Sequence, residues 1–161
     1  MRPYTGFDGN VKRPLPSMNR FIDYVTFLSE GGLWNNGAYG VRKMRGKESE
    51  SVHGTGRAVD LSWRRTKIGR GRRGFGDAAK AERFIQDLLI KNADVLQIEL
   101  VLDYWPQPHG RGWRCDRNEW QNYARRTIVG APRGDWFHVE ISPAAARDPE
   151  FFDRAFKKVF G

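Results

Sequence analysis

Residues 51–63 read Ser-Val-His-Gly-Thr-Gly-Arg-Ala-Val-Asp-Leu-Ser-Trp, a glycine-punctuated turn that leads into a short alternating segment. The alternation predicts a strand over residues 58–63 whose apolar side chains face away from Asp60. Because glycine tolerates backbone conformations that other residues avoid, the turn can bring the chain close to another group. We therefore expect the turn and the strand to place His53 and Asp60 near one another.

A second alternating segment lies near the C-terminus, where residues 135–141 read Asp-Trp-Phe-His-Val-Glu-Ile. A strand there places Trp136, His138 and Glu140 on one face. Two imidazoles and one carboxylate form a ligand set that leaves the fourth position of a zinc ion open, as catalytic zinc sites do. The two segments supply such a set: His53, Asp60 and His138.

The composition of the 161-residue chain indicates one globular domain over residues 1–161, with an irregular Pro- and Gly-rich segment at 1–16. The 13% aromatic content favours a packed core. No stretch approaches the roughly 18 apolar residues that a membrane-spanning helix needs, so no membrane span is expected. The first residues lack an apolar run, so the sequence predicts no secretory signal peptide. The single cysteine, Cys115, excludes an intramolecular disulfide framework.

The pattern of apolar residues favours the α+β class, because strands and helices mix without a strict βαβ rhythm. Helical spacing predicts a helix capped by Ser17, a second capped by Asp77 and a last one capped by Asp148, with Pro149 as its first residue. A strand is predicted over residues 96–104. A polar loop is predicted to follow over residues 106–119.

The net charge of +9 and the isoelectric point near 10.0 favour polyanionic partners. The stretch at 64–74 reads Arg-Arg-Thr-Lys-Ile-Gly-Arg-Gly-Arg-Arg-Gly and is predicted to be a basic loop. It has no interleaved aromatic residues, so it offers attraction for phosphates without a surface on which bases stack. Charge alone leaves nucleic acid, anionic membranes and anionic cell walls open as partners.

Two motifs carry a resemblance to a known family. The pattern Ser-x-His-x-x-Gly-x-Ala-x-Asp over 51–60, followed by Asp-x-x-His over 135–138, resembles the zinc D-Ala-D-Ala carboxypeptidase family. That family includes phage L-alanyl-D-glutamate endopeptidases and is grouped with lysostaphin-type peptidases and the Hedgehog signalling domain. The resemblance covers residues 39–142. It implies a small antiparallel sheet, flanked by helices, that carries one Zn²⁺ on these ligands: His53, Asp60 and His138.

The same resemblance implies two catalytic residues. Asp135 would be the general base, and Arg42, in Gly-Val-Arg, would hold a substrate oxygen and stabilise the oxyanion. The implied reaction is metal-assisted amide hydrolysis in peptidoglycan stem peptides, with Asp135 passing a proton from water to the leaving amine. Three residues apart on a regular strand, Asp135 and His138 would point to opposite faces, so a bulge or loop at 134–135 is required.

We therefore expect a monomeric zinc peptidase that degrades bacterial cell walls, with peptidoglycan as its substrate. As its partner we expect the anionic cell wall in preference to nucleic acid. Without a signal peptide, a phage endolysin would wait in the host cytoplasm until it is released to the wall. The sequence leaves carboxypeptidase and endopeptidase activities both open. The alternative is a basic module that binds nucleic acid or cell wall and has a structural or degenerate zinc site.

Overall fold

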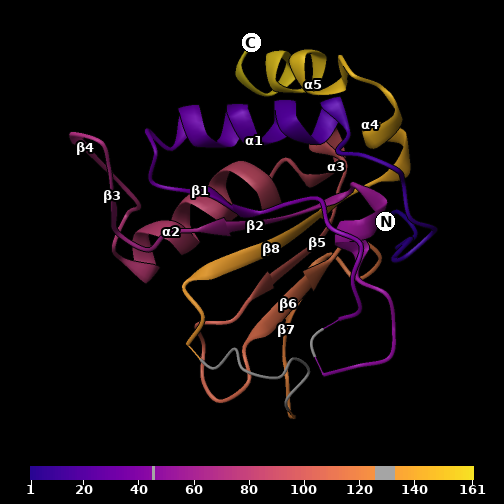
Figure 1. Ribbon diagram of the computed structural model, residues 1–161, viewed down its shortest axis with the longest axis horizontal. Helices are drawn as coiled ribbons and strands as arrows, with labels where there is room; N and C mark the ends of the chain where they lie inside the picture. Colours follow the sequence, from indigo (N-terminus) through magenta and orange to yellow (C-terminus); the bar gives the residue numbers. More distant parts are fainter. Residues whose placement is uncertain (45, 126–132) are drawn as a thin grey trace.

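A six-stranded sheet lies at the centre of the computed structural model, which describes residues 1–44, 46–125 and 133–161 (Figure 1). The strand order is β1-β2-β8-β5-β6-β7, and every neighbouring pair runs antiparallel. The strands are β1 (Trp34–Gly37), β2 (Ala58–Ser62), β5 (Ile98–Asp103), β6 (Arg111–Arg114), β7 (Glu119–Asn122) and β8 (Trp136–Ile141). A separate two-stranded hairpin is formed by β3 (Thr66–Ile68) and β4 (Gly71–Arg73). The predicted α+β class is confirmed.

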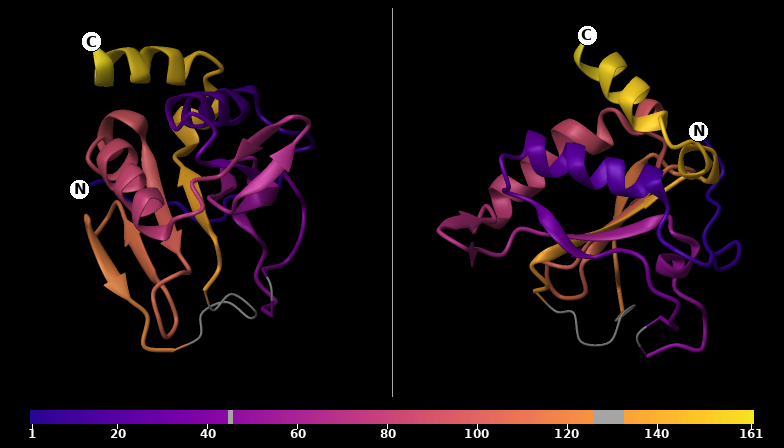
Figure 2. Two further views of the ribbon diagram at one scale, coloured as in Figure 1. Left: turned by 90° about the vertical axis from the view of Figure 1, so that its left-hand side faces the viewer. Right: turned by 45° about the horizontal axis from the view of Figure 1, so that its top comes forward.

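Helices gather on one side of this sheet, with α1 and α5 stacked above it in Figure 1 and seen end-on or obliquely in Figure 2. They are α1 (Pro16–Leu28), α2 (Ala78–Phe84), the π-helix η2 (Ile85–Ile90), α3 (Ala93–Leu96), α4 (Pro143–Arg147) and α5 (Phe151–Phe160). The short 3₁₀ helix η1 (Val52–Thr55) precedes β2. Among the described residues, none of these helices has the length and apolar character needed to cross a membrane.

The helical side of the sheet holds the hydrophobic core. Alternate residues of β2 and β8 point into it and are almost completely buried: Val59, Leu61, Phe137, Val139 and Ile141. They belong to one cluster with buried side chains of the helices, among them Phe21 of α1 and Phe152 of α5. Each such side chain stabilises the fold by about 1.5–3 kcal/mol relative to exposure. Strand alternation then leaves the opposite face of β2 and β8 for polar residues.

Two predicted helix starts are wrong by one or two residues. Helix α1 begins at Pro16, because proline suits the first helical position, and the Ser17 hydroxyl donates 2.6 Å to a carbonyl of α4 instead of capping the helix. Helix α5 begins at Phe151 and not at Pro149, because the Asp148 carboxylate accepts a backbone hydrogen bond within the preceding turn. In both cases a tertiary or turn contact uses the polar side chain that the sequence assigned to the cap.

The predictions for the polar and basic connections are also wrong. Within residues 106–119, predicted as a loop, the chain forms β6 and starts β7, whose cross-strand pairs include Trp113 opposite Trp120. The basic segment 64–74 contains the β3–β4 hairpin. The predicted strand at 96–104 is shorter, because Leu96 ends α3. These strands form because each one pairs with a neighbouring strand. The composition of a segment does not show which segment it will pair with.

The N-terminal segment, residues 1–15, has no helix or strand but is fastened to the sheet. The guanidinium of buried Arg57 donates to the carbonyls of Gly6 and, at 2.7 Å, of Ile141, and lies 3.0 Å from the Asp8 carboxylate. A buried charge with several hydrogen-bonded partners fixes its neighbours strongly, because losing one partner would leave the charge uncompensated. The segment thus becomes a wall beside the polar face of the sheet.

Candidate metal centre

The register between the neighbouring strands β2 and β8 brings a carboxylate and an imidazole together. Asp60 of β2 is the direct cross-strand partner of His138 of β8. Such partners have Cβ atoms about 4.5–5.5 Å apart and share a face of the sheet. The Asp60 Oδ1 atom lies 3.1 Å from His138 Nδ1. Strand pairing alone therefore explains this part of the predicted site.

The turn before β2 supplies the second imidazole. The backbone N–H of His53 bonds to the Ser51 hydroxyl, and the 3₁₀ turn ends at Gly56 with φ of 75°. A Cβ at Gly56 would approach Leu15 Cγ to 2.7 Å, so a side chain there would disturb the turn. His53 Nε2 then lies 3.3 Å from Asp60 Oδ1. One donor atom from each of the three residues lies within 4.8 Å of the others, so this largely buried group could hold a metal ion.

Outer partners fix how both imidazoles face Asp60. His53 Nδ1 lies 2.5 Å from the Ala38 carbonyl oxygen. A carbonyl only accepts, so Nδ1 carries a hydrogen there, and Nε2 is the ring nitrogen that faces the Asp60 carboxylate. His138 Nε2 likewise lies 2.8 Å from Glu140 Oε1, which directs Nδ1 inward. Such partners orient the histidine ligands of metal sites.

The Glu140 carboxylate is itself held by the N-terminal segment. The Tyr4 hydroxyl donates to Glu140 Oε2 at 2.8 Å, and Glu140 is only 3% exposed. Burial, together with the adjacent Glu140 charge, raises the pKa of Tyr4 well above its ordinary value, so the hydroxyl keeps its proton. Strand alternation in the sequence already placed Glu140 on the same face as His138. No sequence signal linked Tyr4 to the site, because 136 residues separate the pair.

The charges of the group favour a cation at its centre. Burial opposes ionisation of Asp60, but hydrogen bonds from His138 and His53 outweigh it and hold the pKa of the carboxyl below its usual range. Burial also disfavours the charged form of His138, but hydrogen bonds to Asp60 and Glu140 prevail and raise its pKa to about 10. The same negative surroundings stabilise either a proton or a metal ion, which compete for the imidazole nitrogen.

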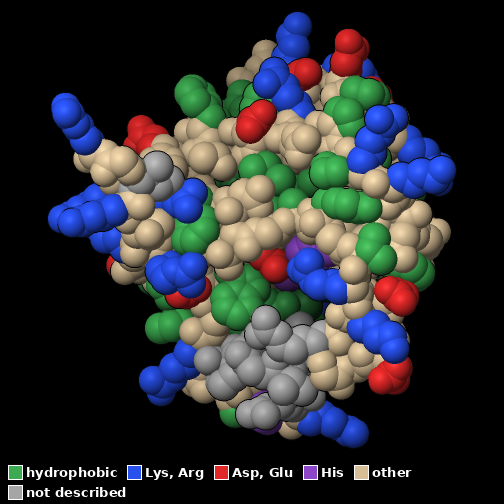
Figure 3. All heavy atoms as spheres, in the orientation of Figure 1, with side chains coloured by type: hydrophobic (Ala, Val, Ile, Leu, Met, Phe, Trp, Pro, Cys, Tyr) green, Lys and Arg blue, Asp and Glu red, His purple; other side chains and the backbone are tan. Residues whose placement is uncertain are grey.

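The three residues lie at the floor of a cavity of about 490 Å³ on the face away from the helices. Figure 3 shows histidine and acidic side chains at the bottom of a hollow, with Lys and Arg side chains around it. Tyr4 and Phe7 contribute to the wall from the N-terminal segment, and Tyr104 and Trp136, whose rings lie 5.0 Å apart, contribute from the sheet. The group is therefore accessible to a molecule that enters from this side.

The structure brings Arg42 to this cavity but leaves its side chain exposed. Arg42 lies among the lining residues. Its backbone carbonyl accepts a hydrogen bond of 2.9 Å from the N–H of Ser51, two residues before His53. The segment that carries Arg42 is thus tied to the turn that carries a potential ligand. The role of Arg42 in binding a substrate oxygen stays a prediction.

Asp135 is placed differently from the other predicted residues. It lies one residue before β8, and its carboxylate is 3.1 Å from Arg64 Nη1 and 3.5 Å from the Ser62 hydroxyl. It is not among the residues that line the cavity. The pairing of β2 with β8 runs without a register shift as far as Ser62 and Trp136, so no bulge within that ladder turns Asp135 inward. Its role as a base stays a prediction.

Comparison with known proteins adds no relative to this description. No family model matches the chain, and neither a curated protein nor a solved structure matches it.

Proposed function

We propose that the protein is a zinc-dependent peptidase that hydrolyses an amide bond in peptidoglycan stem peptides. The observation that carries the proposal is the convergence of three donor atoms on the floor of an open cavity: His53 Nε2, Asp60 Oδ1 and His138 Nδ1. The motif resemblance supplies the substrate class. In this proposal the protein acts as a monomer, reaching the wall from the host cytoplasm as a phage endolysin.

The donor set suits Zn²⁺. Zinc accepts imidazole nitrogen and carboxylate oxygen with bonds of about 2.0–2.2 Å, and a tetrahedron of that size has edges of about 3.3–3.6 Å. The two measured contacts to Asp60 Oδ1, 3.3 Å from His53 and 3.1 Å from His138, are close to such edges. When bound, Zn²⁺ supplies Lewis-acid polarisation of an amide carbonyl and activation of water.

Residues of the chain divide the remaining tasks. Arg42 presents a permanent positive charge to the cavity, where it can bind a carboxylate or carbonyl oxygen of a stem peptide. Glu140 holds the ring of His138 and is a poor candidate for the base, because both its oxygens are engaged and it is buried. Asp135 takes the proton-accepting role when its carboxylate leaves Arg64 and turns toward the cavity.

A second candidate is a basic binding module with a structural metal ion. The position of Asp135, which pairs with Arg64 outside the cavity lining, favours this binding module. A purely structural metal site needs no general base. The two candidates differ in one measurable property. Only the peptidase releases new amino and carboxyl groups from peptidoglycan.

The test measures metal content by mass spectrometry and identifies the fragments released from purified peptidoglycan. We expect about one zinc per chain and a single kind of cleaved amide bond. His53→Gln should lose both metal and hydrolysis. His109→Gln is the matched control, because His109 lies in the connection between β5 and β6 and is not among the cavity-lining residues. Bound metal with no released fragment from any wall preparation would favour the binding module.

A further inference from the structure

The β3–β4 hairpin is the most strongly basic element of the described structure that the metal centre does not use. It projects beyond the central sheet, at the far left of Figure 1 and again at the left of the right-hand view in Figure 2. Residues 64–73 contain no acidic residue. The basic residues are Arg64, Arg65, Lys67, Arg70, Arg72 and Arg73.

The base of the hairpin is fixed to the body. The guanidinium carbons of Arg73 and Arg64 lie 4.0 Å and 5.2 Å from the ring centroid of Trp34, and the indole N–H donates to the Arg64 carbonyl at 2.9 Å. The Gly74 N–H donates to the Gly31 carbonyl at 2.8 Å. Gly74 has φ of 91°, and a Cβ there would lie 2.0 Å from the Arg64 oxygen. These contacts hold the hairpin in one direction before any ligand binds.

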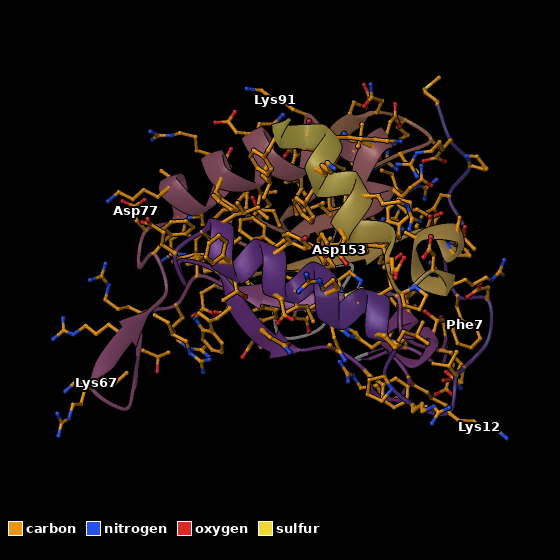
Figure 4. The ribbon with its side chains drawn as sticks, turned by 90° about the horizontal axis from the view of Figure 1, so that it is seen from above. Phe7, Lys12, Lys67, Asp77, Lys91 and Asp153 are labelled. Carbon is orange, nitrogen blue, oxygen red and sulfur yellow. The ribbon has the colours of Figure 1, made fainter. Side chains whose placement is uncertain are left out.

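The outer part of the hairpin carries three cations that the fold does not use. Lys67, Arg70 and Arg72 are exposed, and their side chains have no hydrogen bond or ion pair with other described residues. Figure 4 shows Lys67 at the outer end, directed away from the body. Some other exposed cations are paired, as Arg20 is with Asp153 at 2.7 Å. The hairpin charges are therefore free to contact an external anion.

The register of the β3–β4 hairpin favours a role in binding an anion over the alternative that its charges are only solvated. Lys67 and Arg72 are direct cross-strand partners. Like charges placed directly opposite one another destabilise a sheet, and a short two-stranded ribbon has little stability to lose. A polyanion that lies along the ribbon would replace this repulsion with attraction and release its own counterions.

We propose that the β3–β4 hairpin is a docking arm for a linear polymer of polyol phosphate units attached to the cell wall. The charge complementarity rests on Lys67, Arg70 and Arg72, whereas the choice of wall polymer rests on the proposed function. Residues 66–73 contain no aromatic side chain on which bases could stack, which disfavours single-stranded nucleic acid. The arm would hold the enzyme on the wall while the cavity reaches a stem peptide.

The test compares two triple variants that remove the same charge from the full chain. One is Lys67→Gln/Arg70→Gln/Arg72→Gln. The control is Lys12→Gln/Lys157→Gln/Lys158→Gln, whose residues are also exposed and lack described partners; Figure 4 places Lys12 at the opposite end of the molecule from Lys67. Binding to soluble polyglycerol phosphate, and to duplex DNA of equal phosphate number, is measured at several salt concentrations. Neither ligand contains a peptide bond, so the outcome does not depend on hydrolysis.

We expect the hairpin variant to bind polyglycerol phosphate about tenfold to a hundredfold more weakly at 0.1 M salt. The slope of log K against log salt should fall by about 2, since each lost phosphate contact contributes roughly 0.7 on a flexible polyanion. The control variant should change affinity by no more than about threefold, and the parent should bind polyglycerol phosphate at least as tightly as DNA. Equal losses in the two variants, or tighter binding to DNA, would overturn the proposal.

Discussion

The floor of the cavity and its rim are held in place by different kinds of contact. On the floor, Asp60 and His138 are cross-strand partners, and each imidazole has an outer partner that fixes its ring. On the rim, Arg42 is exposed, and beyond the lining residues Asp135 is held by a partly exposed contact with Arg64. Exposed ion pairs contribute about 0–1 kcal/mol. The side chains of the floor, which could hold a metal ion, are therefore fixed before any ion binds, whereas small energies decide where Arg42 and Asp135 point.

The largest expected effect on metal affinity comes from replacing Asp60, the carboxylate on the floor of the cavity. Asp60→Asn keeps the shape but removes the charge that faces both imidazoles. Structural Zn²⁺ in zinc-finger peptides binds with about 10–16 kcal/mol, or about 2.5–4 kcal/mol for each of four ligands, so losing one ligand should weaken affinity by about 10²- to 10³-fold. Metal titration should show this loss, and hydrolysis should fall to background. Asp103→Asn, which alters a buried carboxylate on neighbouring β5, should keep the metal.

A rim variant should separate chemistry from metal binding. Asp135→Asn should lower kcat by about 10²- to 10⁴-fold, as expected when a general base is removed, and leave the zinc content unchanged. Zinc analysis and steady-state hydrolysis of peptidoglycan fragments check both statements. Full activity in this variant would exclude Asp135 as the base.

Replacing Glu140 or Tyr4, which hold the His138 ring from outside, should have a smaller effect on metal affinity. Glu140→Gln should weaken zinc binding by about 10- to 100-fold, because the amide orients the His138 ring less strongly than a carboxylate does. Tyr4→Phe should act in the same direction by less than about tenfold, since it removes one hydrogen bond to Glu140. Competition with a chelator measures both affinities. A lower melting temperature of the metal-free protein with unchanged zinc affinity would show that the contacts only stabilise the fold.

The smallest expected effect concerns the ion pair at the rim. Arg64→Gln removes the partner that holds the Asp135 carboxylate outside the cavity lining. The change should raise kcat/KM by at most about fivefold, because an exposed pair stores no more than about 1 kcal/mol. Arg65→Gln, a change to the neighbouring exposed arginine, is the matched control. A loss of activity in Arg64→Gln alone would mean that Arg64 supports the site instead of restraining Asp135.

The predictions that succeeded depend on a regular repeat in the chain. Alternation over residues 58–63 and 135–141 correctly separated the core side chains from those that share a face with Asp60 and His138. The same reasoning predicted that a regular strand would point Asp135 away from His138. The predictions that failed concern segments without a repeat, such as β6, β7 and the β3–β4 hairpin, which form because a neighbouring strand satisfies their backbone groups.

The sequence by itself determined which side chains could form a metal centre, because strand periodicity assigns Asp60 and His138 each to a polar face. Only the tertiary structure decided that these faces adjoin in register, that a carbonyl at Ala38 and the Glu140 carboxylate orient the imidazoles, and that Tyr4 reaches Glu140 from the N-terminal segment. Periodicity is a local property of a strand. Register and long-range hydrogen bonds depend on which segments pack together, and no local pattern records that choice.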